Sequence, residues 1–164
     1  MPTRAHELHV SYDEEKELIK ECVTQAFKSL RRKGFWARQS FMCCGGCARA
    51  ELGTRFSNAV AEKQAALQGA VFYTRQDAEV FNRGGVFHKL WLYYGAVHSD
   101  DGVTSALATV EVGQAVKAEL EVFGLVVDWD GHPESAILVT GLGDAWVAAA
   151  KIGGLAALPV MGRK

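Results

Sequence analysis

Helical segments and short apolar runs alternate along most of this chain, and that order constrains the fold more than any other feature. Apolar residues recur every three or four positions between residues 12 and 34, and short runs rich in aromatic and branched residues follow at 35–42 and 70–73. Helices that alternate with strands are typical of layered α/β proteins. The alternation therefore predicts a single α/β domain with helices packed on a mixed sheet of about five strands, with α+β as the alternative.

The first helix is predicted from its charges and its termini. Ser11 and Glu14 match a capping box, acidic residues follow in the first turn, and basic residues lie in the last turn before Gly34. This order complements the helix dipole, and a glycine is a common helix stop. The side predicted to be buried consists of Leu18, Ile19, Cys22, Val23, Ala26, Phe27 and Leu30. Cys22 is therefore expected to act as a small buried hydrophobe.

The later elements are predicted from turn residues and apolar periodicity. Helices are expected at 47–65, from Thr74 and Asp77 to Gly84-Gly85, and from about 109 to 123, and strands at 35–42, 70–73, 86–97, 125–129 and 136–139. The link between the last two strands is short and rich in turn residues, which predicts an antiparallel hairpin at the C-terminal end of the domain. The domain is expected to cover residues 1–140, and the Gly/Ala-rich segment 141–164 is expected to form an appendage.

The charge balance excludes some classes of partner. The chain has 18 basic and 19 acidic residues, a formal net charge of −1, so nothing in its charge favours nucleic acid or an anionic membrane. The apolar segment 145–161 is short for a membrane span and contains Lys151, so we expect no span there. No signal peptide is expected after Met1, and the predicted location is the cytoplasm. The oligomeric state stays open, a homo-oligomer included.

Three of the four cysteines lie within five positions, at Cys43, Cys44 and Cys47. Cys44-Gly45-Gly46-Cys47 is a C-x-x-C motif between a predicted strand and a predicted helix. A thiol at a helix N-terminus is favoured as the thiolate by the free amides there. One hypothesis is therefore a thiol-redox enzyme with Cys44 as the nucleophile and Cys47 as the resolving thiol. If Cys43 belongs to the strand, its side chain is expected to point to the opposite side.

The same spacing provides half of a structural zinc site, which normally has four ligands. Cys43, Cys44 and Cys47 could bind zinc together with one distant histidine. The histidines His6 and His9 are three positions apart, but they precede the predicted domain core, and the other three are widely spaced. Zinc is the one cofactor that the sequence suggests. The alternative without a cofactor is that the three cysteines pack around the Gly-Gly turn.

Polar residues at two strand-to-helix junctions form a second candidate site. Arg38 and Gln39 precede the cysteines, and Gln76 and Asp77 open the helix after the second strand. Residues at such junctions line the crevice at one edge of an α/β sheet. Asp77 has an alternative role as the capping partner of Thr74. The sequence contains no nucleophile-elbow, metalloprotease or phosphate-loop motif, so it leans away from an enzyme.

The segment 35–47, FWARQSFMCCGGC, resembles the signature of a family of uncharacterised, mainly bacterial proteins. The segments FYTRQD at 72–77, LYYG at 92–95 and VDWDG at 127–131 are similar to the rest of that family's pattern. The resemblance covers residues 34–140 and implies one intact domain without an assigned activity. The leading hypothesis is a small cytoplasmic binding or regulatory domain with the cysteine cluster as its distinctive site. A thiol-redox enzyme and a structural zinc protein are the alternatives.

Overall fold

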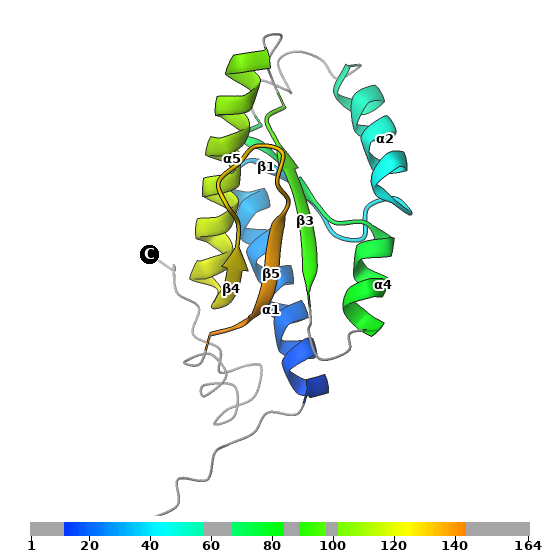
Figure 1. The fold of residues 1–164 in the computed structure, drawn as a ribbon, viewed down its shortest axis with the longest axis vertical. Helices are drawn as coiled ribbons and strands as arrows, with labels where there is room; N and C mark the ends of the chain where they lie inside the picture. Colours follow the sequence, from blue (N-terminus) through cyan, green and yellow to red (C-terminus); the bar gives the residue numbers. More distant parts are fainter. Residues whose placement is uncertain (1–11, 58–66, 84–88, 98–101, 144–164) are drawn as a thin grey trace, which may run out of the picture.

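The computed structural model describes residues 12–57, 67–83, 89–97 and 102–143 (Figure 1). In chain order the elements are α1 (Tyr12–Arg32), β1 (Phe35–Arg38), α2 (Gly45–Ser57), β2 (Gly69–Phe72), α4 (Arg75–Arg83), β3 (Leu90–Gly95), α5 (Gly102–Val122), β4 (Leu125–Asp128) and β5 (Ile137–Leu142). No helix in this described part of the chain is long and apolar enough to cross a membrane.

The strands form one five-stranded mixed sheet in the order β1-β2-β3-β5-β4. β1 and β2 are parallel, whereas the other neighbouring strands are antiparallel. α2 lies in the connection between β1 and β2, because parallel neighbours need a crossover. β4 and β5 form the hairpin that the turn-rich link predicts. The expected fold class, a single α/β domain with a mixed sheet and a C-terminal hairpin, is confirmed.

The main hydrophobic core lies between one face of the sheet and the helices α1 and α5. Every residue of the predicted apolar side of α1 is buried, and Cys22 is 1% exposed as expected of a small hydrophobe. On α5, Val112, Val116 and Leu120 recur every four positions and are buried against the same core. The apolar periodicity of the sequence predicted the buried side of α1, because a helix that covers a sheet buries one side only.

A buried carboxylate links α1 to α5 at the edge of this core. Glu119 of α5 is 5% exposed, and its carboxylate accepts hydrogen bonds from Ser29 Oγ of α1 and from Lys33 Nζ, directly after the end of α1. A buried charge is costly unless it is paired and hydrogen-bonded. The two donors therefore make Glu119 compatible with the interior and keep the ends of the two helices together.

α2 and α4 lie on the other side of β3 from α5 (Figure 1). The predicted capping box at the start of α4 is present: Thr74 N donates to Asp77 Oδ2 over 2.9 Å, and Asp77 N donates to Thr74 Oγ1 over 3.2 Å. Phe81 of α4 is 3% exposed and reaches the core beside Leu90. The cap and this one aromatic anchor position α4 against β3.

The first strand is shorter than predicted. It ends at Arg38, not at residue 42, because Ser40 and Met42 have φ angles of 50° and 58°. This left-handed conformation is incompatible with an extended strand. The following helix begins at Gly45, two positions before its predicted start at Cys47, and residues 58–65 of the predicted helix lie outside the described residues.

Three other boundaries also differ from the prediction. α5 begins at Gly102, well before residue 109, and β3 ends at Gly95. β5 runs to Leu142, beyond residue 139, because Gly141 and Leu142 pair with β4 across a β-bulge at Val126 and Val127. Cross-strand pairing, which periodicity along one segment does not reveal, decides where this strand ends. The described residues do not include 1–11, 84–88 and 144–164. Ser11, the start of the predicted third strand and most of the expected appendage fall in these ranges.

Replacing Phe27 with alanine tests the core assignment. Phe27 is fully buried, and its ring meets that of Tyr73 edge to face with centroids 5.8 Å apart. We expect Phe27→Ala to lower the free energy of unfolding by about 3–5 kcal/mol, the range for a truncated buried aromatic side chain. The matched control is Val80→Ala, whose side chain is 53% exposed. Urea unfolding measures both, and equal effects of the two variants would contradict the packing described.

Candidate functional site

The three clustered cysteines lie where the chain leaves β1 and enters α2. The loop between these elements contains Ser40 and Met42 in the left-handed region. Such a conformation costs a residue other than glycine about 1–3 kcal/mol, so it persists only where surrounding contacts impose it. Two strained residues so close to the cysteines indicate that the path of this loop is held in place by its neighbours.

Backbone hydrogen bonds between this loop and the start of α4 supply the restraint. They run from Phe41 N to Tyr73 O (2.8 Å), from Arg75 N to Met42 O (3.0 Å) and from Gln76 N to Cys43 O (3.1 Å). The amides of Arg75 and Gln76 belong to the first turn of α4, where amides have no partner within the helix. The loop carbonyls therefore accept hydrogen bonds from the first amides of α4, and these bonds hold Cys43 in position.

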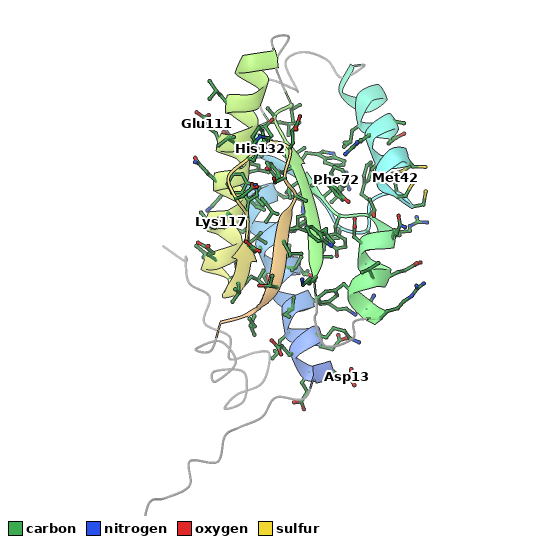
Figure 2. All side chains as sticks on the ribbon, viewed as in Figure 1. Asp13, Met42, Phe72, Glu111, Lys117 and His132 are labelled. Atoms are coloured by element: carbon green, nitrogen blue, oxygen red, sulfur yellow. The ribbon has the colours of Figure 1, made fainter. Side chains whose placement is uncertain are left out.

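The three thiols converge at the surface. The Sγ atoms of Cys43, Cys44 and Cys47 all lie within 4.8 Å of one another, and those of Cys43 and Cys44 are 3.8 Å apart. All three are free thiols, and Cys43 and Cys47 are exposed. In Figure 2, Met42 lies beside the start of α2, with yellow sulfur atoms at the outer edge of the molecule. Cys43 was expected to point to the opposite side only if it belonged to the strand. β1 ends at Arg38, and after the left-handed Met42 the Cys43 thiol lies beside the other two.

Cys44 and Cys47 differ in their electrostatic surroundings. Cys44 precedes α2, and its carbonyl accepts the first helical hydrogen bond from Ala48 N over 3.0 Å. A hydrogen bond from the amide of Cys47, followed by those from the thiols of Cys47 and Cys43, lowers the pKa of the Cys44 thiol. Hydrogen bonding to the sulfur atoms of Cys43 and Cys44 raises the pKa of the Cys47 thiol to about 11. Burial raises the pKa of the Cys22 thiol in the core to about 12.

Arg38 and Gln39, from the second predicted site, point to different partners. Gln39 Nε2 donates to Thr24 Oγ1 over 3.0 Å and to the Tyr73 hydroxyl over 3.2 Å, so this side chain ties the loop to α1. The Arg38 guanidinium lies 5.6 Å from the ring centroid of Trp36, which is two positions earlier on the same face of β1. The structure places the Arg38 and Gln39 side chains on opposite sides of the strand, in agreement with strand alternation.

The other two residues of that prediction lie at the start of α4. Gln76 contributes its backbone amide to Cys43 O, and its side chain is exposed. Asp77 caps the helix through Thr74, whose hydroxyl donates to Asp77 Oδ2 over 2.7 Å. Asp77 also raises the pKa of Tyr93, after the larger effect of burial. Asp77 therefore has the capping role that the sequence offered as an alternative, and its charge also acts on Tyr93 of β3.

Sequence reasoning missed a cleft of about 620 Å³ between α2 and the sheet. Gly45, Arg49 and Leu52 line it from α2, and Phe72 and Tyr93 line it from β2 and β3. Figure 2 shows Phe72 between β3 and α2. The sequence alone does show that the three α2 residues are spaced to lie on one side of a helix. The sheet side was not foreseeable, because the pairing of Phe72 with Tyr93 depends on the register of two strands.

Comparison with known protein families places these features in one domain. A family model described as a domain of unknown function (DUF6891) matches residues 4–146. The chain belongs to this family. The match covers every described helix and strand, so the cysteine loop and the cleft are both parts of the DUF6891 domain. It confirms the family resemblance of the cysteine segment. No curated protein and no solved structure matched the chain.

The unequal surroundings of the thiols predict unequal reactivity in the DUF6891 domain. Because the pKa of Cys44 is lowered and that of Cys47 is raised to about 11, a larger fraction of Cys44 is thiolate at neutral pH. We expect iodoacetamide at pH 7 to label Cys44 well before Cys47, with Cys22 last because it is buried. Mass mapping of a labelling time course in the absence of metal measures this order. Equal rates at Cys44 and Cys47 would contradict it.

Proposed function

We propose that this DUF6891 protein is a binding domain that takes up a thiophilic metal ion, Zn²⁺ first among them, on Cys43, Cys44 and Cys47. The observation that carries the proposal is the convergence of three sulfur atoms within 4.8 Å of one another. Two thiolates bound to a tetrahedral zinc at about 2.3 Å lie about 3.8 Å apart. The Cys43–Cys44 Sγ distance of 3.8 Å has this value without any rearrangement.

The third thiol distinguishes a metal site from a dithiol pair. Redox chemistry at a C-x-x-C motif needs Cys44 and Cys47 only. Cys43 joins them because Met42 is left-handed and because the carbonyls of Met42 and Cys43 are bound to the start of α4. Backbone strain of this kind is found most often at functional sites. The preorganised third sulfur therefore supports metal coordination more than a dithiol reaction.

Within the described residues, the three thiols leave one position of a tetrahedral metal ion without a protein ligand. Among the described residues, no histidine, carboxylate or further cysteine joins the three thiols. Structural zinc sites are closed by four protein ligands, whereas an open position leaves room for water, a small thiol or a partner's side chain. In the cytoplasm predicted from the sequence, thiols stay reduced and available for metal. A site that is open to a fourth ligand from outside the chain supports a regulatory or metal-transfer role. A distant histidine would instead close a structural zinc site, and His6, His9, His88 and His98 lie outside the described residues.

Metal titration tests the proposal. The reduced protein, titrated with Zn²⁺ in competition with a chromogenic chelator, is expected to bind about one equivalent per chain and to become more resistant to thermal unfolding. Substitution with Co²⁺ should produce thiolate-to-metal charge-transfer absorption. Cys43→Ser, Cys44→Ser and Cys47→Ser should each weaken Zn²⁺ binding roughly tenfold or more, because each removes one ligand.

Gly46→Ala is the matched control within the same loop. A Cβ at Gly46 would meet nothing within 4 Å, so this variant should bind Zn²⁺ as the parent protein does. Cys22→Ala removes the one cysteine outside the cluster and should also bind Zn²⁺ normally. Retention of full affinity in Cys43→Ser, with loss only in the other two serine variants, would restrict the site to two thiols and contradict the proposal.

A second candidate function, thiol–disulfide exchange at Cys44 and Cys47, is favoured by the hydrogen bond from the Cys47 amide to the Cys44 sulfur. With oxidised glutathione as the oxidant, the Cys44 thiolate attacks one sulfur of the disulfide and releases one glutathione thiolate, which takes up a proton. Cys47 then loses its proton and attacks Cys44 Sγ, which releases the second glutathione. Two electrons pass from the cysteine pair to the glutathione disulfide.

Disulfide mapping after this reaction separates the two candidate functions. Exchange predicts a Cys44–Cys47 disulfide, with Cys43 still available to an alkylating reagent. Prior loading with Zn²⁺ should suppress the reaction if the metal occupies the same thiols. Stable mixed disulfides with glutathione at all three positions, without an internal disulfide, would contradict redox cycling.

A further inference from the structure

The cleft between α2 and the sheet has the size and the lining of a small-molecule site. Its volume of about 620 Å³ falls within the roughly 300–1,000 Å³ that is usual for such sites. The three cysteines are not among the residues that line it, so the cleft is a site separate from the proposed metal site. From its floor and its charges, we propose that the cleft binds a planar aromatic ligand that carries one anionic group.

The floor of the cleft is aromatic. Phe72 on β2 and Tyr93 on β3 are register partners, and their rings are stacked with centroids 5.4 Å apart and an interplanar angle of 28°. Phe41 from the cysteine loop meets the other side of Phe72 edge to face at 5.7 Å. Planar aromatic groups are well suited to such a surface, because ring pairs are stabilised beyond the area that they bury.

α2 contributes a positive charge above this floor. Arg49 lies one helical turn after Gly45 on the side that lines the cleft. Burial and then the Asp77 carboxylate raise the pKa of the Tyr93 phenol, and the charge of Arg49 acts against both by lowering it. No salt bridge to Arg49 occurs within the described part of the chain. A guanidinium beside an aromatic floor, with no carboxylate partner among the described residues, suits a carboxylate, sulfonate or phosphate group.

The opposite wall is the turn between β4 and β5, and it is held by side-chain hydrogen bonds. The Tyr94 hydroxyl donates to Ser135 O over 2.7 Å and accepts from Trp129 Nε1 over 2.8 Å. Asp130 accepts from His132 N over 2.8 Å and from Ser135 Oγ over 2.9 Å, which lowers the pKa of Asp130. A wall fixed in this way lowers the entropy lost on binding.

Glu134 on this wall places a negative charge opposite Arg49. Its exposed carboxylate disfavours a second anionic group on the ligand. The two walls therefore differ in sign, and a ligand with a single anion would place it at Arg49. The same polarity provides a test in which two substitutions act in opposite directions.

Two fluorescent probes with the same ring system separate the aromatic and the anionic parts of the proposal. 8-Anilino-1-naphthalenesulfonate carries a sulfonate, whereas N-phenyl-1-naphthylamine is its uncharged counterpart. Each is titrated against the folded, reduced full-length protein with a chelator present, so that metal has no influence. We expect saturable binding of the sulfonate probe at about one site per chain, roughly tenfold tighter than that of the neutral probe.

Charge variants then locate the site. Arg49→Gln should weaken binding of the sulfonate probe roughly to the level of the neutral probe, and Glu134→Gln should strengthen it, with the neutral probe little changed in both. Arg83→Gln is the matched control, because Arg83 is an exposed arginine of α4 outside the cleft. Equal affinity for both probes, or equal effects of Arg49→Gln and Arg83→Gln, would overturn the proposal. Circular dichroism and thermal unfolding of each variant check that the fold is unchanged.

Discussion

The backbone hydrogen bonds between the cysteine loop and the start of α4 are the constraint on which the surface features depend. Arg75 N and Gln76 N donate to the carbonyls of Met42 and Cys43. Together with the bond from Phe41 N to Tyr73 O, they offset the cost of the left-handed conformation of Met42. The bonds connect segments from either side of β2, and they direct Cys43 toward the other two thiols. A helix start is well suited to this task because its first amides need external acceptors.

The sheet divides the molecule into two faces with different roles. On one face α1 and α5 form a tightly buried core that is closed at its edge by the pairing of Glu119 with Ser29 and Lys33. On the other face α2 leaves an open cleft over Phe72 and Tyr93. The stability of the fold rests on the first face, so the second is free to carry a cleft and a group of exposed thiols. Such a division is common in α/β proteins, where loops at strand ends carry the functional groups.

Much of the fold could be predicted because the relevant signals are local. The apolar side of α1, the Thr74–Asp77 cap and the turn between β4 and β5 each depend on residues only a few positions apart. The ends of β1 and β5 were predicted wrongly because they depend on contacts with distant segments. The end of β1 depends on hydrogen bonds to α4, and the end of β5 depends on its pairing with β4. Both are set by contacts between segments that are distant in the sequence.

The sequence by itself determined the class of the fold, the buried side of α1 and the presence of a three-cysteine segment at the junction of a strand and a helix. Only the tertiary structure decided that the three sulfur atoms converge within 4.8 Å of one another, because the direction of Cys43 depends on the backbone of Met42 and on the helix that binds it. The tertiary structure likewise decided that Arg49 faces Phe72 and Tyr93 across a cleft. Spacing along the chain places side chains on one face of an element, whereas the register and the packing of elements decide what that face meets.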